Sequence, residues 1–257
     1  MSFKNKVVLI TGGSGGIGKA IAKEFLNEEA TVILTDNKKS LISEAEVELA
    51  IYKERLNTKI LDITSVESIR DCIQYIKEQH NQLDVLINNA GMCKIRPALE
   101  ILPEEWDLVF NINLKGLFFC SQFAAKIMLE NGQGTIINIA SNAGKVGFPD
   151  QADYNAAKAG VISLTRSLAD EWAKYNVNVN AVCPGAVETK MLVDIANLIA
   201  ARDCYDPEQL LKSFAPKQLG RLISPSEVAK VVVFLASNKA SIIRGQSINV
   251  DGGNTPY

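Results

Sequence analysis

The chain has 257 residues, of which 47% are apolar and 22% are charged, and its formal charge is −2. These values are ordinary for a folded domain and exclude a disordered chain, a collagen-like repeat and a small disulfide scaffold. We expect no nucleic acid partner, because the chain has no net positive charge, and no membrane span, because no apolar stretch approaches ~18 residues. The apolar run at the start is too short for a signal peptide, so we expect a cytoplasmic protein.

Cysteine and histidine usage narrows the chemistry further. The five cysteines are an odd number without a Cys-x-x-Cys pair, which predicts reduced thiols. His80 is the only histidine, so we expect no histidine-based zinc site and no metal. A Ser-His-Asp triad would depend on that one residue.

Strand and helix patterns alternate along the whole chain. β-branched apolar runs and helical apolar spacing predict, in chain order, a strand at 6–11, a helix at 16–29, a strand at 31–35, a helix at 39–57, a strand at 58–61, a helix at 65–79, a strand at 83–88, a helix at 103–130, a strand at 135–140, a helix at 154–175, a strand at 177–183, a helix at 225–237 and a strand at 247–250. No repeat or linker interrupts this order. We therefore expect one α/β domain over residues 1–257, a doubly wound, Rossmann-like parallel sheet of about seven strands with helices on both faces.

A glycine-rich turn follows the first predicted strand. Residues 11–18 read Thr-Gly-Gly-Ser-Gly-Gly-Ile-Gly and lead into the first predicted helix. Glycines let the backbone approach a pyrophosphate closely, and the helix start directs unpaired N–H groups at it. Asp36 ends the next strand, where a carboxylate would accept hydrogen bonds from the adenosine ribose. Asp36 could instead cap a helix or form a turn, but the preceding glycine turn favours the ribose.

The spacing Thr-Gly-x-x-x-Gly-x-Gly departs from the usual dinucleotide fingerprint and resembles that of the classical short-chain dehydrogenases/reductases. Further motifs of that family follow in the same order: Asn-Asn-Ala-Gly at 88–91, Asn113, Ser141, Tyr-x-x-x-Lys at 154–158 and Pro-Gly at 184–185. The resemblance covers nearly the whole chain. It implies a catalytic set of Asn113, Ser141, Tyr154 and Lys158.

Tyr154 and Lys158 are four residues apart and share one face of a helix. A free phenol has a pKa near 10, and a neighbouring lysine cation would lower the pKa of Tyr154 toward the range of a general acid–base group. By resemblance, Ser141 bonds the same substrate oxygen, Lys158 also reaches the nicotinamide ribose, and Asn113 holds a water on a proton path. Taken singly, each residue has a plainer explanation as a surface pair, a turn residue or a polar packing residue. Their joint occurrence with the glycine turn favours the catalytic set.

The resemblance also implies the cofactor contacts. They lie in the glycine turn, at the ends of the second, third, fourth and sixth strands, and on the catalytic helix. These residues are Gly12, Ser14, Gly15, Gly16, Ile17, Gly18, Asp36, Asp62, Ile63, Asn89, Ala90, Gly91, Tyr154, Lys158, Pro184, Gly185, Val187 and Thr189.

We expect NAD rather than NADP, because Asp36 would lie against a 2′-phosphate. NADP-using relatives often carry a basic residue just before the second motif glycine, where this chain has Gly15, and Asn37 after Asp36 is also uncharged. Lys38 and Lys39 are the contrary evidence, because they could bind a phosphate if their loop turned inward.

These features favour an enzyme that interconverts a secondary alcohol and a ketone on a small-molecule substrate. Residues 190–219 should fold over that substrate as a lid, with one helical pattern from Met191 and a second helix start at Asp206. A lid of this layout resembles those of polyol, sugar-alcohol and vicinal-diol dehydrogenases. The side chains expected to meet such a substrate are Ser141, Asn142, Gln151, Tyr154 and Tyr205. A lid that only packs on the cofactor is an equally open alternative.

Two other functions stay open, and so does the oligomeric state. One is an NADPH-dependent 3-oxoacyl thioester reductase, a close relative by fold; the other is a non-catalytic dinucleotide sensor, which would not need the catalytic set. The family usually forms homotetramers through the helices at 106–130 and 154–175. Apolar side chains there could serve such an interface or the core: Phe118, Phe119, Phe123, Leu168 and Trp172.

Overall fold

All seven strands join one parallel sheet in the order β3-β2-β1-β4-β5-β6-β7. The computed structural model describes residues 2–256. The strands are β1 (Val7–Ile10), β2 (Thr31–Asp36), β3 (Leu56–Ile60), β4 (Val85–Asn88), β5 (Gly134–Ile139), β6 (Val177–Pro184) and β7 (Ser247–Val250). The strand order reverses between β1 and β4, which is where dinucleotides bind in doubly wound sheets. The predicted fold class is confirmed.

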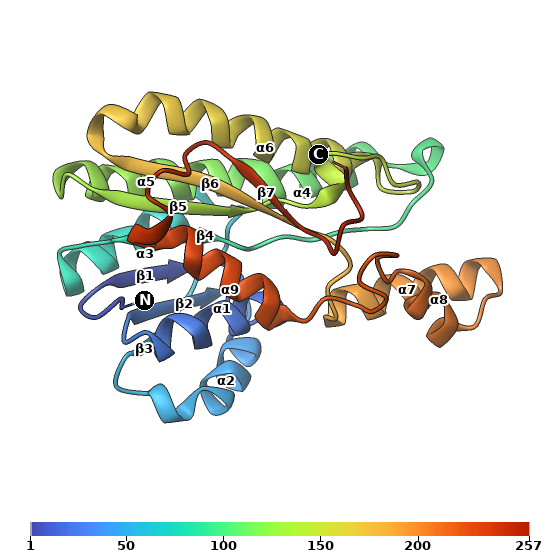
Figure 1. The fold of residues 1–257 in the computed structure, drawn as a ribbon, viewed down its shortest axis with the longest axis horizontal. Coiled ribbons are helices and arrows are strands. Elements are labelled where there is room, and N and C mark those ends of the chain that lie inside the picture. Colours follow the sequence, from blue (N-terminus) through green and yellow to red (C-terminus); the bar gives the residue numbers. More distant parts are fainter. Residues whose placement is uncertain (1, 257) are drawn as a thin grey trace.

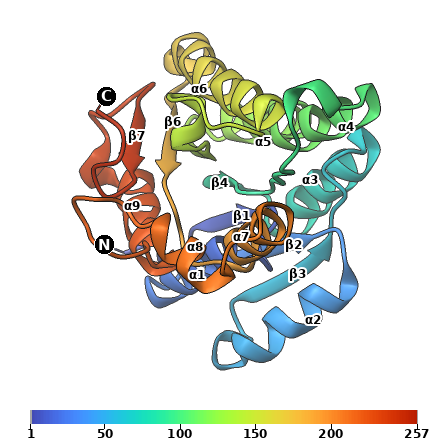
Figure 2. The same ribbon diagram turned by 90° about the vertical axis from the view of Figure 1, so that its right-hand side faces the viewer.

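Helices cover both faces of the sheet (Figures 1 and 2). They are α1 (Gly16–Asn27), α2 (Lys39–Glu48), α3 (Val66–His80), α4 (Pro103–Phe110), α5 (Gly116–Glu130), α6 (Ala152–Trp172) and α9 (Pro225–Ala236). Two more helices, α7 (Lys190–Asp203) and α8 (Pro207–Ser213), lie outside these two layers (Figure 1). Alternate residues of β1 point to opposite sides, so Val8 packs with α1 and α9 while Leu9 packs with α3 and α5. Buried aliphatic side chains fill the space between the sheet and the helices on both faces, which explains why the strands are apolar along their whole length.

The predicted helix at 39–57 is too long. α2 ends at Glu48, a short 3₁₀ turn covers Ala50–Tyr52, and β3 begins at Leu56. The chain leaves the helix because the carbonyl of Arg55 accepts a hydrogen bond from Val32 N (2.8 Å) and so starts the ladder with β2. Tertiary pairing therefore overrides the helical pattern at this point.

The predicted helix at 103–130 is interrupted by a π turn at Asn111–Lys115. A π turn inserts one residue and leaves a backbone carbonyl without its usual helical donor. Asn113 Nδ2 donates to the carbonyl of Val109 (3.0 Å), and to that of Met92 outside the helix (2.9 Å). The side chain therefore stabilises the distortion and joins the helix to the loop after β4.

This helical stretch, Pro103–Glu130, is long and apolar enough to cross a membrane by length and composition. The expectation that no apolar stretch approaches that length was therefore wrong. In the fold the stretch packs on the sheet: Cys120, Ala124 and Met128 are fully buried in the core cluster that includes α3. A core helix explains its composition.

α7 and α8 project beyond the carboxyl ends of the strands (Figure 1). Thr189 Oγ1 accepts from Leu192 N (3.4 Å) at the start of α7, and Asp206 Oδ1 accepts from Gln209 N (2.8 Å) at the start of α8. The two helical patterns predicted within residues 190–219 are therefore present. That the segment acts as a lid stays a prediction.

Candidate active site

The glycine turn is held against the loop after β4. Gly12 has φ +58°, and a Cβ there would lie 2.7 Å from the Cα of Ala90. Asn89 Nδ2 donates to the carbonyls of Thr11 (3.1 Å) and Gly12 (2.7 Å), and Thr11 Oγ1 accepts from the backbone N–H groups of Asn89 and Ala90 (both 3.1 Å). Only glycine fits at residue 12, because a side chain would meet both the backbone strain and the contact.

The turn has the features of a phosphate cradle. α1 starts after Gly15, with no side chain capping its N–H groups. Ser14 Oγ is buried and has no hydrogen-bond partner within residues 2–256. A Cβ on Gly16 would lie 2.9 Å from Thr189 Cγ2, so Thr189 stands beside the turn. Unpaired donors at a helix N-terminus bind anions, so these residues fit the pyrophosphate of a dinucleotide.

Two acidic residues follow β2 and β3. Asp36 is half-buried at the end of β2, and its Oδ1 accepts from Asn37 N (2.9 Å). Lys38 and Lys39 are exposed and form no ion pair with it. Asp62 is exposed, and its Oδ1 already accepts from Thr64 N (2.8 Å) and Thr64 Oγ1 (2.7 Å). Asp36 therefore has more free capacity than Asp62 to accept hydrogen bonds from the ribose hydroxyls.

The remaining predicted cofactor residues lie on the same edge of the sheet. Ile63 is buried and packs so closely on Gly116 of α5 that no Cβ would fit there. Gly185 packs on Asp251, where a Cβ would lie 2.9 Å from the Asp251 Cα. Val187 is bridged to Ile223, whose N–H and C=O bond to the neighbours of Val187. The backbone N–H of Val187 therefore points away from that bridge, on the side of the crevice.

The four predicted catalytic residues converge on the loop after β4. Lys158 is 4% exposed, its Nζ donates to the carbonyl of Ile139 (2.8 Å), and it lies 5.7 Å from the centre of the Tyr154 ring. Ser141 stands close enough to the Tyr154 phenol to influence its pKa. A Cβ on Gly91 would lie 2.9 Å from Asn113 Oδ1 and 3.5 Å from Lys158 Nζ. These contacts place the hydroxyl, phenol, ammonium and amide in one site.

Burial dominates the ionisation of this site. Burial raises the pKa of the Tyr154 phenol above its ordinary value, and the Ser141 hydroxyl opposes that rise. Burial also lowers the pKa of Lys158 to about 8. The predicted lowering of the Tyr154 pKa by Lys158 is thus not found: burial outweighs it, and the Lys158 ammonium, 5.7 Å from the centre of the phenol ring, donates to the Ile139 carbonyl. A further positive charge near the phenol would be needed to bring its pKa down.

The predicted substrate residues are unevenly placed. Asn142 is 5% exposed, and Ser141 Oγ donates weakly to its Oδ1 (3.5 Å). Gln151 is half-buried at the start of α6. Tyr205 is 60% exposed beyond the end of α7, so it lies outside the buried part of the site. That any of the three contacts a substrate stays a prediction.

Three segments meet at the mouth of this site. Arg96 N, in the loop after β4, donates to the carbonyl of Asp150 (2.8 Å), in the loop before α6. The carboxylate of Asp150 pairs with Arg202 near the end of α7 (2.9 Å). The ion pair therefore joins the predicted lid to the loop that leads into the catalytic helix.

Two further residues contribute to the site. Cys93 follows the Asn-Asn-Ala-Gly motif after β4, a position that predicts a place beside the pocket, and it lies close enough to Tyr154 and Lys158 to interact electrostatically with both. Burial raises the pKa of its thiol to about 12, so Cys93 is a neutral residue of the site. Sequence reasoning missed Thr11, which organises the turn through its hydroxyl. Its position before Gly12 was the available signal.

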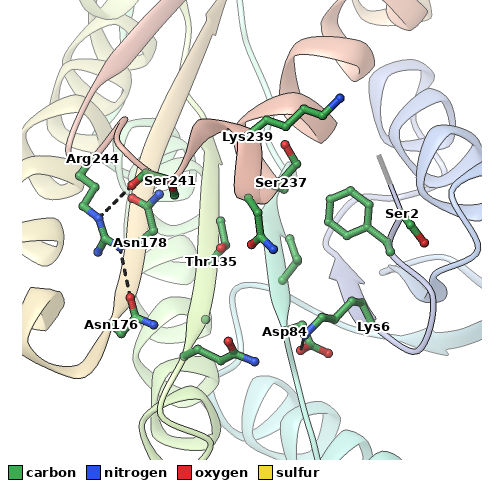
Figure 3. Close-up of a pocket in the computed structure, with 16 residues that line it drawn as sticks. Ser2, Lys6, Asp84, Thr135, Asn176, Asn178, Ser237, Lys239, Ser241 and Arg244 are labelled. Atoms are coloured by element: carbon green, nitrogen blue, oxygen red, sulfur yellow. Dashed lines mark hydrogen bonds and ion pairs between the residues drawn. The ribbon is translucent and has the colours of Figure 1, made fainter.

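A depression of about 380 Å³ lies at the opposite edge, at the amino ends of β4, β5 and β6 (Figure 3). Lys6 pairs with Asp84 (2.9 Å) there, and Arg244 bonds the Ser241 carbonyl and Asn176 (both 3.2 Å). The cations Lys6, Lys239 and Arg244 lie on different sides of the depression and do not converge. It is therefore a weaker candidate site than the convergent one at the carboxyl ends.

Comparison with known proteins agrees with this geometry. A family model described as enoyl-(acyl carrier protein) reductase matches residues 12–255. The 3-oxoacyl-[acyl-carrier-protein] reductase of Thermotoga maritima is 38% identical, over 98% of this chain and 99% of the relative. The NAD-dependent glycerol dehydrogenase of Listeria innocua serovar 6a is 36% identical, over 99% of this chain and 95% of the relative. A solved structure of a variant actinorhodin polyketide ketoreductase with NADPH matches with a TM-score of 0.94 and 33% identity, over 100% of both chains.

The fold and these relatives define an oxidoreductase that binds a nicotinamide dinucleotide and interconverts alcohols and ketones on small-molecule substrates. The chain belongs to the short-chain dehydrogenase/reductase family, and its motifs are those of the classical type.

Proposed function

We propose that this protein is an NAD-dependent dehydrogenase that interconverts a secondary alcohol and a ketone on a polyol, a sugar alcohol or a vicinal diol. The observation that carries the proposal is the convergence of Ser141, Tyr154, Lys158 and Asn113 beside a glycine turn that fits a pyrophosphate. A non-catalytic sensor on the same fold would not need that convergence.

The four side chains have distinct roles in the proposed chemistry. The bound nicotinamide supplies the site that gives or accepts hydride. Tyr154 exchanges a proton with the substrate oxygen, and Ser141 donates a hydrogen bond that fixes this oxygen. Lys158 holds positive charge near the phenol and reaches toward the ribose hydroxyls. Asn113 keeps the loop after β4 in place through Met92 and holds a water that links Lys158 to solvent.

The proposed preference for NAD rests on Asp36. Its carboxylate stands at the end of β2 without a paired cation within residues 2–256, so it would repel a 2′-phosphate and bond free ribose hydroxyls. Gly15 and Asn37 offer no positive charge there. The similarity to a relative described as NAD-dependent supports this assignment, whereas a structural neighbour was solved with NADPH, so the proposal rests on Asp36 of this chain.

The proposed substrate class rests on the α7–α8 segment and on Asn142 and Gln151. A pocket built to bond hydroxyl groups rejects analogues without them, because its own polar groups are left unpaired. The relative described as a glycerol dehydrogenase supports a hydroxylated substrate. The test compares turnover of polyols, sugar alcohols and vicinal diols with that of a simple secondary alcohol, using NAD and NADP separately.

A second candidate is an NADPH-dependent 3-oxoacyl thioester reductase. The specific observation in its favour is the 38% identity to a relative of that description. A 3-oxoacyl thioester in the same panel distinguishes the two. Equal or better turnover of the thioester would refute the polyol assignment and leave the reaction class intact.

We also propose a cytoplasmic homotetramer that pairs through α5 and α6. Phe110, Leu114, Phe118 and Leu164 line an apolar groove of about 640 Å³ on these helices. Leu168 and Trp172 are at most 8% exposed and belong to the core, so they cannot serve this interface. Light scattering coupled to gel filtration tests the assembly: a monomer of the parent protein would refute it, and Phe118→Glu should dissociate a tetramer.

A further inference from the structure

A chain of buried hydrogen bonds runs along one face of the sheet, from α5 across β4 and β5 to α6. Asn88 and Asn138 are partners in the register of β4 and β5, and Asn88 Nδ2 donates to Asn138 Oδ1 (2.8 Å). Asn138 Nδ2 donates to Thr165 Oγ1 of α6 (2.9 Å), and Asn88 Nδ2 donates also to Ser121 Oγ of α5 (2.8 Å). All four side chains are at most 2% exposed.

The direction of these bonds is fixed. Ser121 Oγ donates to the carbonyl of Leu117, and Thr165 Oγ1 donates to that of Val161 (both 2.8 Å). A hydroxyl has a single proton, so each oxygen can face the asparagines only as an acceptor. Both amides are therefore held in one orientation. Asn88 Oδ1 is buried without a partner within residues 2–256, whereas every donor of the network is paired. Such a network favours one arrangement of its elements, because other arrangements would leave more of its polar groups unpaired.

Every member of the network lies on an element that carries a predicted functional residue or adjoins the segment that carries one. On α6, Thr165 follows Lys158 by seven residues, which is close to two helical turns and places both on one face. On β5, Asn138 precedes Ser141 by three residues. Ser121 lies in the helix that continues from the Asn113 π turn, and Asn88 ends the strand that leads to Gly91. The network thus joins the four elements whose side chains make up the site.

We propose that Asn138 and Thr165 are positioning residues for the reaction. They touch no reacting atom; they hold α6 against β5 so that Tyr154 and Lys158 meet Ser141. The inference rests on the proposed roles of Tyr154 and Lys158. A purely stabilising network would change the thermal stability of the protein but not the geometry or turnover of the folded site.

Thr165→Val is the informative variant. It keeps the size and the β-branch, removes the hydroxyl, and leaves Asn138 Nδ2 without its acceptor. Thr165→Ser keeps the hydroxyl and is the rescue variant. The matched control is Asn180→Ala: Asn180 is fully buried on the neighbouring strand β6, and its side chain bonds Asn178 and the Ile243 carbonyl, away from the site. Each variant is examined for melting temperature, dinucleotide affinity, kcat, KM and the crystal structure of the site.

A displacement of about 1 Å at reacting groups can lower a rate by about 100-fold, so we expect at least a tenfold fall in kcat for Thr165→Val, with dinucleotide affinity within about threefold. Thr165→Ser should recover kcat to within about twofold of the parent, and Asn180→Ala should lower the melting temperature with kcat within about twofold. In the Thr165→Val crystal structure, the Lys158 Nζ bond to Ile139, 2.8 Å in the parent, should be lengthened or lost.

Two results would overturn the proposal: a folded Thr165→Val protein with parental kcat, or an equal fall in kcat for Asn180→Ala at the same loss of melting temperature. If the parent itself turns over none of the substrates, the proposed function fails. The crystal structures then decide the positioning role alone, and an unmoved Lys158 in Thr165→Val would refute it.

Discussion

Removal of the Asp36 carboxylate should relax the choice between the two dinucleotides. The perturbation is Asp36→Asn, which keeps the shape of the side chain and its capacity to accept from Asn37 N. A 2′-phosphate bound at the ribose would lie next to the carboxylate. Two unit charges ~4 Å apart repel by about 4 kcal/mol at an effective dielectric constant near 20. Asp36 is only half-buried, so solvent screening reduces this value, and about 2 kcal/mol is the magnitude we expect.

A difference of about 2 kcal/mol corresponds to a roughly 30-fold preference for NAD in kcat/KM. The assay measures kcat/KM for NAD and NADP with one alcohol substrate, for the parent, Asp36→Asn and the control Lys38→Ala. The parent should prefer NAD, Asp36→Asn should lose most of that preference by gaining activity with NADP, and Lys38→Ala should leave the ratio within about twofold. A parent enzyme that prefers NADP would refute the reasoning, as would a fall in NADP activity in Lys38→Ala, which would mean that the loop binds the phosphate.

Three further predictions concern the site and the stability of the chain. Tyr154→Phe should lower kcat by at least about 100-fold with dinucleotide affinity nearly unchanged, because only the proton-carrying oxygen is lost; turnover within a few-fold of the parent would reject its role. Gly12→Ala should destabilise the fold by about 1–3 kcal/mol and abolish dinucleotide binding, since φ is +58° and the Cα of Ala90 is 2.7 Å from the new methyl; calorimetry that finds parental affinity would contradict the cradle. The free energy of unfolding should fall as pH rises above about 8.5. Burial raises the pKa of Cys72 to about 12 and of Cys183 to about 11, so these thiols lose their protons in the unfolded chain before they do in the folded one. The lowered pKa of Lys158 acts in the opposite direction, but it is one group against two. Urea denaturation at pH 7.5 and 9.5 checks the sign, and an equal or higher midpoint at pH 9.5 would count against it.

The fold was readable from the sequence wherever local pattern and tertiary pairing agree. The alternation of strands and helices predicted the parallel sheet, and the apolar pattern from Met191 and the helix start at Asp206 predicted α7 and α8. The end of α2 was not predictable, because it depends on where β3 joins the sheet. That point is set by the hydrogen bond from Val32 N to the Arg55 carbonyl, which joins residues far apart in the chain. The π turn was not predicted for a related reason: the Met92 carbonyl, which binds Asn113 and stabilises the turn, lies outside the helix.

The sequence predicted which residues come together in the site, but not the direction in which the pKa of Tyr154 is shifted. Spacing alone places Tyr154 and Lys158 on one face, and motif order brings Ser141 and Asn113 beside them. The direction of the phenol pKa depends on burial and on the distance between ammonium and phenol, neither of which the spacing contains. Residue type suggested a polar contact for Tyr205, and its 60% exposure, which the sequence does not contain, leaves that contact a prediction.

The π turn has a consequence for changes in chain length. The turn accommodates one extra residue, so deletion of one residue within Asn111–Lys115 would restore a regular α-helix and leave the fully buried Cys120 and Ser121 on the core side. The deletion would instead remove the local geometry in which Asn113 binds the carbonyls of Val109 and Met92. The turn around Gly132 is different, because open space surrounds that residue and α5 has already ended. Insertions and deletions among relatives should therefore collect at Gly132, and a single deletion within Asn111–Lys115 should spare the fold but disrupt the site.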